Sequence, residues 1–197
     1  MIETIAAITR IALDAAAAEA PEEAIWCITR ALPALLGDRA AALAPNAFRE
    51  DPPPAVGAAA AAFMLSPCRR YHVITAPVNF RPEQHLERVA IELGHPGEVA
   101  RTRRPMLLRD TALHASFVKI LQSFRAGSSM FAPLLWKGDY LGVLICANAA
   151  RNTFGESDLI AHQGFAALAA ALWMAHGGPS WLAAIDLSGK PLRDRGT

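Results

Sequence analysis

The sequence predicts an α/β fold, with helices near both ends of the chain and most of the strands between them. A strong β-hairpin signal comes from the linker Lys137-Gly138-Asp139, which separates two apolar runs at residues 129–136 and 140–148. Apolar residues then recur at helical spacing from Asp158 to Ala175. Hydrophobic residues make up 53% of the 197 residues, which is ample for one buried core.

Two helices are expected at the start of the chain. Residues 1–19 carry an apolar stripe at helical spacing. Pro21 suits the first turn of a second helix, which is expected to run to Leu36 and to end at Gly37. Pro33 lies inside this second helix and is expected to kink or shorten it.

Strands are expected in the first half of the chain at residues 39–43, 59–65 and 71–76, although the alanines of the second segment would equally permit helix. Three consecutive prolines make residues 49–54 a loop. Apolar residues between Leu86 and Leu93 alternate after Val89, which predicts a strand with one buried face. Residues 94–97 are expected to end that strand.

The middle of the chain predicts two short helices. The first covers residues 98–104 and stops before Pro105, and a short strand at residues 106–108 follows it. The second covers residues 113–126, because Phe117, Ile120, Leu121 and Phe124 are spaced as one helical face. Gly127 is expected to end it.

The final long helix is expected to have Ser157 as its cap and Asp158 at the positive end of its dipole. It carries two apolar stripes. One stripe is expected to cover a sheet, and the other, with Ala166, Ala169 and Trp173, is expected to meet a second helix or a partner. Residues 181–192 are expected to form a small hairpin before a frayed end.

Composition argues against several classes of protein. Charged residues are 19% of the chain and the net charge is +1, so nothing favours binding to nucleic acid or to an anionic membrane. No uninterrupted apolar run reaches the about 20 residues that span a bilayer. The chain starts Met1-Ile2-Glu3, with an acid where a signal peptide would carry a cation. A cytoplasmic protein is therefore expected.

The cysteines and histidines do not form a recognisable metal or redox motif. Cys27, Cys68 and Cys146 are odd in number and widely spaced, so they are expected to be reduced and mostly buried. The six histidines include no pair at metal-ligand spacing, so no metal site is expected. A Gly-x-Ser-x-Gly nucleophile motif, paired carboxylates and a phosphate loop are also missing, so the sequence does not favour an enzyme.

The order of these elements and three loose motifs resemble a GAF domain. The motifs are Gly97 with Arg104-Pro105 and Arg109-Asp110, then Gly127-Ser128-Ser129 with the hairpin, then Asn148 with Phe154 and Asp158. The resemblance covers residues 21–175. It divides the chain into an N-terminal helix at 1–20, a GAF-like domain at 21–176 and a C-terminal tail at 177–197.

The resemblance implies an α+β sandwich with a central six-stranded antiparallel sheet. The terminal helices would lie on one face, and short helices would cover a ligand pocket on the other. It also implies a non-catalytic sensor that binds a small organic molecule, dimerises through its first and last helices and signals to an effector protein. The alternatives are a ligand-free scaffold for dimerisation or partner docking and a small redox enzyme related to free methionine sulfoxide reductase.

Several ligand classes known in GAF domains match this sequence poorly. Ala149 and Leu159 replace the lysine and glutamate of the cyclic-nucleotide signature, and no cysteine near His114 could attach a bilin. Free methionine sulfoxide reductases, the related redox enzymes, use cysteines where this chain has residues 95–98 and 116–119. A haem bound axially by His95 or His114 stays open as a minor alternative.

The resemblance places a set of candidate ligand-binding residues around the pocket: Tyr71, His95, Val99, Arg109, Asp110, His114, Phe117, Phe124, Ser128, Ser129 and Phe131. Arg109 would hold an anionic group of the ligand or pair with Asp110 or Glu98. The phenylalanines are explained equally well as pocket wall and as core.

Overall fold

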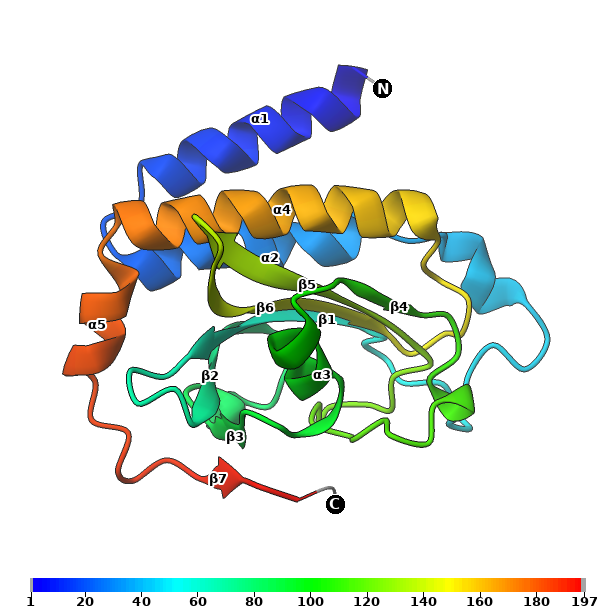
Figure 1. Cartoon of the computed structure of the whole chain (residues 1–197). Coiled ribbons are helices and arrows are strands. Elements are labelled where there is room, and N and C mark those ends of the chain that lie inside the picture. Colours follow the sequence, from blue (N-terminus) through cyan, green and yellow to red (C-terminus); the bar gives the residue numbers. More distant parts are fainter. Residues whose placement is uncertain (1, 196–197) are drawn as a thin grey trace.

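The computed structural model describes residues 2–195 and forms one seven-stranded sheet with a layer of helices over one face (Figure 1). The strands are β1 Ala58–Leu65, β2 Tyr71–Val78, β3 Arg88–Ala90, β4 Met106–Leu108, β5 Ser128–Trp136, β6 Asp139–Asn148 and β7 Leu192–Arg193. The α-helices are α1 Ile2–Ala16, α2 Pro21–Leu35, α3 Gly94–Thr102, α4 Glu156–Ala175 and α5 Gly178–Ala184. The short 3-10 helices are η1 Arg39–Leu43, η2 Pro82–Gln84 and η3 Thr111–Leu113. The predicted helix start at Met1 and the last two residues of the tail lie outside the described part.

The sheet has the order β4-β5-β6-β1-β2-β3-β7. All neighbouring strands are antiparallel except β3 and β7, which pair in parallel. The expected six-stranded antiparallel sheet is therefore corrected to a mixed sheet of seven strands. The seventh strand comes from the C-terminal tail, which runs down from α5 to the edge of the sheet (Figure 1).

The β5–β6 hairpin is confirmed. Lys137 and Gly138 form its two-residue turn with φ values of +50° and +88°. Two consecutive positive φ values are the backbone geometry of the tight turn that matches the twist of a hairpin, and glycine adopts it without steric cost. The local sequence is therefore sufficient to specify this pair of strands.

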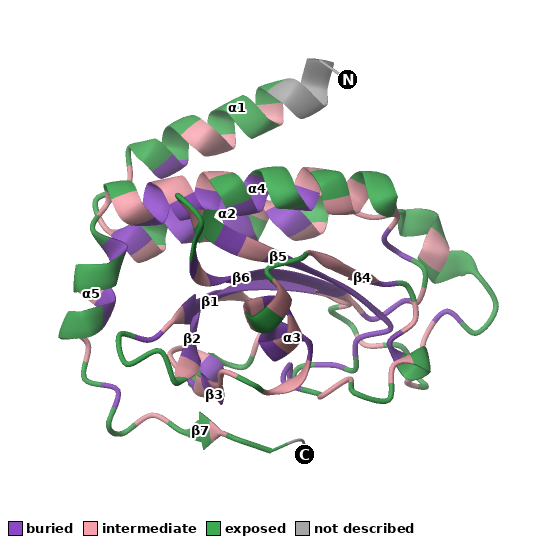
Figure 2. Cartoon of the chain, in the orientation of Figure 1, coloured by how far each residue is buried: buried purple, intermediate pink, exposed green. Residues whose placement is uncertain are grey.

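The central strands are buried on both faces, which Figure 2 shows as a purple centre of the sheet. Along β1, Ala60, Ala62 and Met64 belong to the core beneath the helix layer, whereas Ala61 and Phe63 belong to the core of the opposite face. The same alternation continues in β5 and β6, as the twofold period of a strand requires. Each central strand thus contacts both halves of the molecule.

The helix layer consists of α2 and α4 on the sheet, with α1 lying outside them (Figure 1). Trp173 of α4 is 2% exposed, and its ring lies 5.7 Å from that of Trp181 in α5. Ala166 and Ala169 are also buried within the chain. Of the two alternatives for this stripe, contact with a second helix is confirmed, because α2, α5 and the sheet cover it.

The start of α4 differs slightly from the prediction. The helix begins at Glu156, so Ser157 lies inside it and is not the cap. The carboxylate of Asp158 instead accepts hydrogen bonds from the backbone N–H groups of Gly155, at 2.8 Å, and Gly37, at 2.9 Å. This carboxylate joins the end of the α2 segment to the start of α4.

By length and apolar composition α4 could also cross a membrane. In the folded chain it packs against β5 and α2, and part of its surface is buried there. Its apolar character is thus used in the core of the domain.

Several predicted elements are wrong in type. Residues 39–43 form a 3-10 helix because the side chain of Asp38 accepts the N–H of Ala40 at 2.8 Å and alanine tolerates a helical turn. The predicted strand at 86–93 is reduced to β3, and α3 starts at Gly94, where the sequence suggested only a break. The tail forms α5 and β7 where a small hairpin was expected.

Residues 113–126 do not form the predicted helix. Only Thr111–Leu113 makes a 3-10 turn, and residues 114–126 then have no regular secondary structure. Ile120 packs in the core of the sheet face opposite α2 and α4, while Leu121 and Phe124 pack in a second cluster beside it. Because these apolar side chains are buried in two separate clusters, tertiary packing prevails over the helical preference that their spacing suggested.

Candidate functional site

An apolar cavity lies on the sheet face opposite α2 and α4, beneath residues 114–126, which we call the roof. Its volume is about 40 Å³. The walls come from β1, β5, β6, α3 and the roof, and the lining residues are Ala59, Phe63, Phe80, His95, Pro96, Phe117, Val118, Ile120, Leu121, Ala126, Ser129, Phe131, Ile145 and Ala147. Such a space, apolar with few polar groups, has the composition of a small-molecule site.

His95 of α3 is the titratable group in this wall. Its side chain is buried, with 4% of the residue exposed. The imidazole stacks on Phe131 with ring centroids 5.7 Å apart, and the ring of His114 lies 5.6 Å away at a steep angle. The Nδ1 atom has no hydrogen-bond partner among residues 2–195. A buried polar atom without a partner is uncommon and calls for an explanation.

Burial lowers the pKa of His95, and the neighbouring His114 lowers it further. The ring is therefore neutral at physiological pH. A neutral imidazole has one nitrogen that donates and one that accepts, so His95 can offer a ligand either role depending on its tautomer.

Gly97 explains why α3 sits so close to the cavity. A Cβ atom at this position would collide with the backbone of Glu92 in the turn before the helix. Glycine therefore allows α3 to fold back onto that turn, which brings His95 under the roof. The glycine of the sequence motif is thus a packing requirement.

The roof is held by Gln84 of η2, whose side chain is fully buried. Its amide nitrogen donates to the carbonyl oxygen of Ile120 at 2.8 Å, and its amide oxygen accepts from the N–H of Gln122 at 3.1 Å. These two bonds replace the internal hydrogen bonds that a helix would have supplied. Three more hydrogen bonds join the roof to the domain: Ser123 Oγ donates to the carbonyl oxygen of Asn79 at 2.5 Å, the N–H of Arg125 donates to Glu50 at 2.9 Å, and Thr111 Oγ1 donates to the carbonyl oxygen of Ala126 at 2.6 Å.

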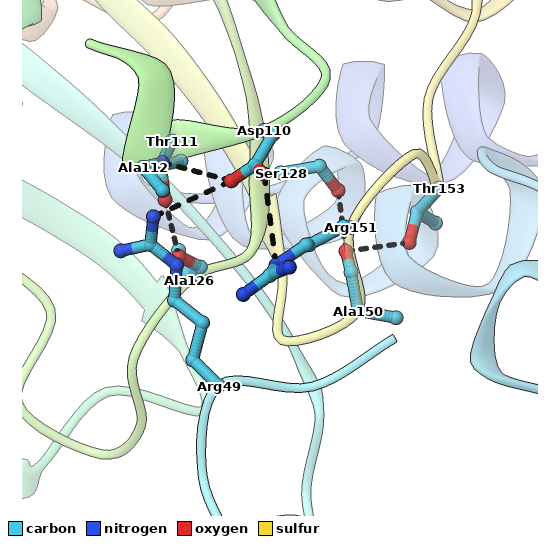
Figure 3. A network of polar contacts seen from close by, with 9 residues as sticks. All are labelled: Arg49, Asp110, Thr111, Ala112, Ala126, Ser128, Ala150, Arg151 and Thr153. Carbon is cyan, nitrogen blue, oxygen red and sulfur yellow. Dashed lines mark hydrogen bonds and ion pairs between the residues drawn. The ribbon is translucent and has the colours of Figure 1, made fainter. Parts of the chain in front are cut away.

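A second, open hollow lies at the end of the sheet where β4 ends and β5 begins. Its volume is about 670 Å³. We call it the cationic hollow, and its lining residues are Asn46, Phe48, Arg49, Thr111, Ala112, His114, Phe117, Arg125 and Arg151. Figure 3 shows the carboxylate of Asp110 between the side chains of Arg49 and Arg151, at 3.3 Å and 3.6 Å respectively.

The structure brings some of the candidate residues together around the two spaces. His95, Phe117, Ser129 and Phe131 line the apolar cavity, and Phe117 and His114 line the cationic hollow. Val99 and Phe124 lie in the buried clusters next to the cavity without lining it. Ser128 is occupied elsewhere, because its hydroxyl donates to the carbonyl oxygen of Ala150 at 2.8 Å.

Two candidate residues lie away from the cavity. Tyr71 packs against the core of the helix-covered face, with the guanidinium of Arg88 5.5 Å from its ring. Arg109 is exposed and lies 3.7 Å from Glu156, so it pairs with neither Asp110 nor Glu98, which had been the expected acids. Asp110 instead pairs with Arg49 and Arg151.

Sequence reasoning missed several residues of both spaces. Phe63 could have been found, because it alternates with Met64 along a strand that is buried on both faces. Phe80, Arg49 and Arg151 lie in loops with no periodic pattern, and only the tertiary fold brings them to the site. No signal in the sequence could have grouped them.

The three cysteines lie away from the cavity. Cys27 is partly buried in α2 and Cys146 is buried in β6 on the helix-covered face. Cys68 is exposed, which corrects the expectation of mostly buried thiols, and hydrogen bonding from Ser66 lowers its pKa to about 7. Within residues 2–195, no three His, Cys, Asp or Glu side chains gather closely enough to hold a metal ion.

A sequence model of the GAF domain matches residues 22–173. The chain belongs to the GAF domain family. This family comprises small-molecule-binding and signalling domains. No protein with a curated description matches the chain.

Solved structures support the GAF fold. The GAF domain of a phosphoenolpyruvate-protein phosphotransferase from Coxiella burnetii has a TM-score of 0.72 at 20% identity, covering 91% of this chain and 97% of that one. The corresponding GAF domain from Acinetobacter has a TM-score of 0.71 at 13% identity, covering 90% and 96%. A free methionine-R-sulfoxide reductase from Neisseria meningitidis has a TM-score of 0.66 at 13% identity, covering 86% and 87%. At these identities the likeness shows the fold alone.

Proposed function

We propose that this GAF protein is a non-catalytic sensor that binds a small organic molecule in the apolar cavity. The observation that carries the proposal is the unpartnered Nδ1 of His95 in an otherwise apolar, aromatic wall. Leaving a buried polar atom without a hydrogen bond costs about 1–3 kcal/mol. A ligand that supplies the missing hydrogen bond would recover that free energy on binding.

The cavity walls define the chemistry of the ligand. Phe117 and Phe131 flank His95 with ring centroids 5.7 Å away in each case, and Ser129 adds one hydroxyl. These walls favour a small, largely apolar molecule with a single hydrogen-bonding group. A haem would need far more space than this cavity offers.

Ligand entry requires the roof to move. The cavity of about 40 Å³ is much smaller than the about 300–1,000 Å³ of typical ligand pockets. The roof has no regular secondary structure, and only a few hydrogen bonds, to Gln84, Asn79, Glu50 and Thr111, join it to the rest of the described chain. Segments with these properties open at low free-energy cost, so an enlarged cavity would be a minor conformation that a ligand stabilises.

The central strands offer a route from the cavity to the helix layer. In β5, Phe131 lines the cavity while its neighbour Met130 packs under the helices. We propose that α1 and α4 form a dimer surface and pass the signal to an effector protein in the cytoplasm. The support is local: Leu13 is 65% exposed and Ile160 is 69% exposed on these two helices.

The alternatives find less support. In a ligand-free scaffold, the missing hydrogen bond at the Nδ1 atom of His95 would have no explanation. A redox enzyme needs a reactive cysteine at its substrate pocket, and here the cavity is lined by none of Cys27, Cys68 and Cys146.

Thermal unfolding in a library of small organic molecules tests the proposal. We expect at least one largely apolar compound with a hydrogen-bonding group to raise the melting temperature of the wild type, because binding to the native state stabilises it. The His95→Leu variant should stay folded, because an apolar side chain still fills the wall, and its own melting temperature without compound is the reference for its shift. It should bind the same compound about tenfold more weakly.

His176→Leu is the matched control, because His176 lies at the C-terminal end of α4 away from the cavity. It should respond to the compound as the wild type does. A library without any hit would favour the scaffold, and a hit that stabilises His95→Leu equally would place the ligand elsewhere.

A further inference from the structure

We propose that the cationic hollow binds a small oxyanion, carried as a carboxylate or a phosphate group. Three arginines line it, and none of the described residues that line it is acidic. Its volume of about 670 Å³ lies within the about 300–1,000 Å³ typical of ligand sites. This proposal does not depend on an occupant of the apolar cavity.

Arg49 gives the strongest evidence that the hollow lacks a hydrogen-bond acceptor. Its side chain is only 9% exposed, and its guanidinium donates to one oxygen of Asp110 at 3.3 Å. Its Nε atom is buried and makes no hydrogen bond within the described part of the chain. A guanidinium has five N–H donors in a planar fork, so Arg49 retains donors for a second acceptor.

Arg151 repeats this pattern. Its Nε atom lies 3.6 Å from Asp110, which is too long for a hydrogen bond, and it too is buried without a hydrogen-bond partner among residues 2–195. The Oδ1 atom of Asp110 accepts from both Arg49 and the N–H of Ala112, the latter at 2.8 Å, whereas its Oδ2 atom lies 3.6 Å from Arg151. One carboxylate is thus divided among three donor groups (Figure 3).

Arg125 adds a third positive charge at the exposed rim. Its guanidinium makes no hydrogen bond to any residue that the structure describes. Glu50 is the other nearby acid, and it accepts the backbone N–H of Arg125 at 2.9 Å but does not line the hollow. Burial lowers the pKa of Arg49, and the charge of Arg125 lowers it further, so an anion in the hollow would relieve this electrostatic strain.

The sheet topology explains why residues so distant in sequence meet here. Asn148 at the end of β6 pairs with Ala58 at the start of β1 and with Ser128 at the start of β5. The segments that precede β1 and β5 and follow β6 therefore leave the sheet at one edge. They carry Arg49, Arg125 and Arg151 respectively.

The arrangement suits oxyanions with two or more acceptor oxygens. Planar guanidinium groups form paired hydrogen bonds with carboxylate and phosphate oxygens. His114 lines the same hollow and adds a polar ring, whereas the hydroxyl of Thr111 already donates to the carbonyl oxygen of Ala126 at 2.6 Å. Phe117 borders both the hollow and the apolar cavity, so the two spaces are neighbours with separate polar groups.

Isothermal titration calorimetry of the full chain with inorganic phosphate, and separately with malonate, tests the proposal. Ionic strength is held constant so that general screening does not change. We expect saturable binding of at least one of the two anions, and the tighter one identifies the class. Arg125→Gln and Arg151→Gln should each weaken it about tenfold, because each removes a charge-assisted hydrogen bond.

Arg104→Gln is the matched control, because it removes the same charge from an exposed residue outside the hollow. It should bind like the wild type, and unchanged melting temperatures should show that every variant is folded. The absence of saturable binding for both anions would overturn the proposal. So would equal weakening by Arg104→Gln, or unchanged binding in both Arg125→Gln and Arg151→Gln.

Discussion

Three buried histidines have a ring nitrogen without a hydrogen-bond partner within residues 2–195: His95, His162 and His72, of which His72 still bonds the hydroxyl of Tyr140 through its other nitrogen at 2.7 Å. His95 lies at the wall of a cavity, where a ligand can reach its free nitrogen. His162 lies in α4, fully buried, and neither of its ring nitrogens has a partner within residues 2–195. The first residue therefore has a candidate function, whereas the second is a cost to stability.

The cost of His162 should depend on pH. Burial lowers its pKa from 6.5 to about 3, so below pH 6.5 the unfolded state binds a proton that the folded state excludes. Stability is lost as the pH falls from about 6.5 toward 3. At pH 5 the loss from His162 is about 2 kcal/mol. His162→Leu should therefore reduce the difference in unfolding free energy between pH 7 and pH 5 by about this amount, as measured by urea denaturation.

Phe165→Leu is a control in the same helix without a titratable group. It should lower stability at both pH values and keep the wild-type difference between them. If His162→Leu also keeps the full difference, the acid sensitivity has another origin.

The sequence could predict individual site residues only where a local motif marked them. His95 was found because it lies beside the motif glycine Gly97, and it does reach the cavity wall. Arg49 and Arg151 are about equally important to the cationic hollow, yet each sits in an irregular loop. Their grouping depends on the pairing of β6 with β1 and β5, which no local pattern encodes.

At the scale of elements, local signals succeeded where they were sufficient. The hairpin follows from two residues with positive φ, and α4 follows from its long apolar period. The helix prediction for the roof was wrong, because an irregular segment that fills two buried clusters can have the same spacing of apolar residues as a helix. Strand β7 was not predicted, because it consists of two residues that pair with β3, a strand about 100 residues earlier in the chain.

The helix layer makes its own prediction about assembly. If α1 and α4 form the dimer surface, replacing both Leu13 and Ile160 with Glu should give a monomer. Each glutamate would bury an unpaired negative charge in an apolar interface, which is strongly unfavourable. Light scattering coupled to size exclusion would measure the mass. Leu43→Glu changes a leucine on η1 that is 86% exposed and should leave the mass unchanged.

A wild type that is already monomeric at high concentration would contradict this surface. An unchanged dimer in the double variant would place the interface elsewhere. Trp173 is unsuitable for this test, because it is part of the core of its own chain and its replacement would destabilise the fold.

In the whole molecule, one sheet separates the apolar cavity from the helix layer. The central strands place alternate residues in the cores of the two faces. Because these cores are closely packed, we expect a side-chain movement in the cavity wall to shift the packing beneath α2 and α4. The general fold was predictable because GAF domains share this order of elements. The mixed seven-stranded sheet and the closed state of the cavity depend on tertiary contacts of the tail and of Gln84.

Ligand entry requires the roof to open, and amide hydrogen exchange measures this opening. We expect residues 114–126 to exchange about a hundredfold faster than the amides of β5 and β6, through local opening. Gln84→Leu should speed exchange of the roof more than that of the strands, because it removes two of the hydrogen bonds that hold the roof. Roof amides that exchange only as slowly as β5 and β6, in the wild type and in Gln84→Leu alike, would contradict a cavity that opens to admit a ligand.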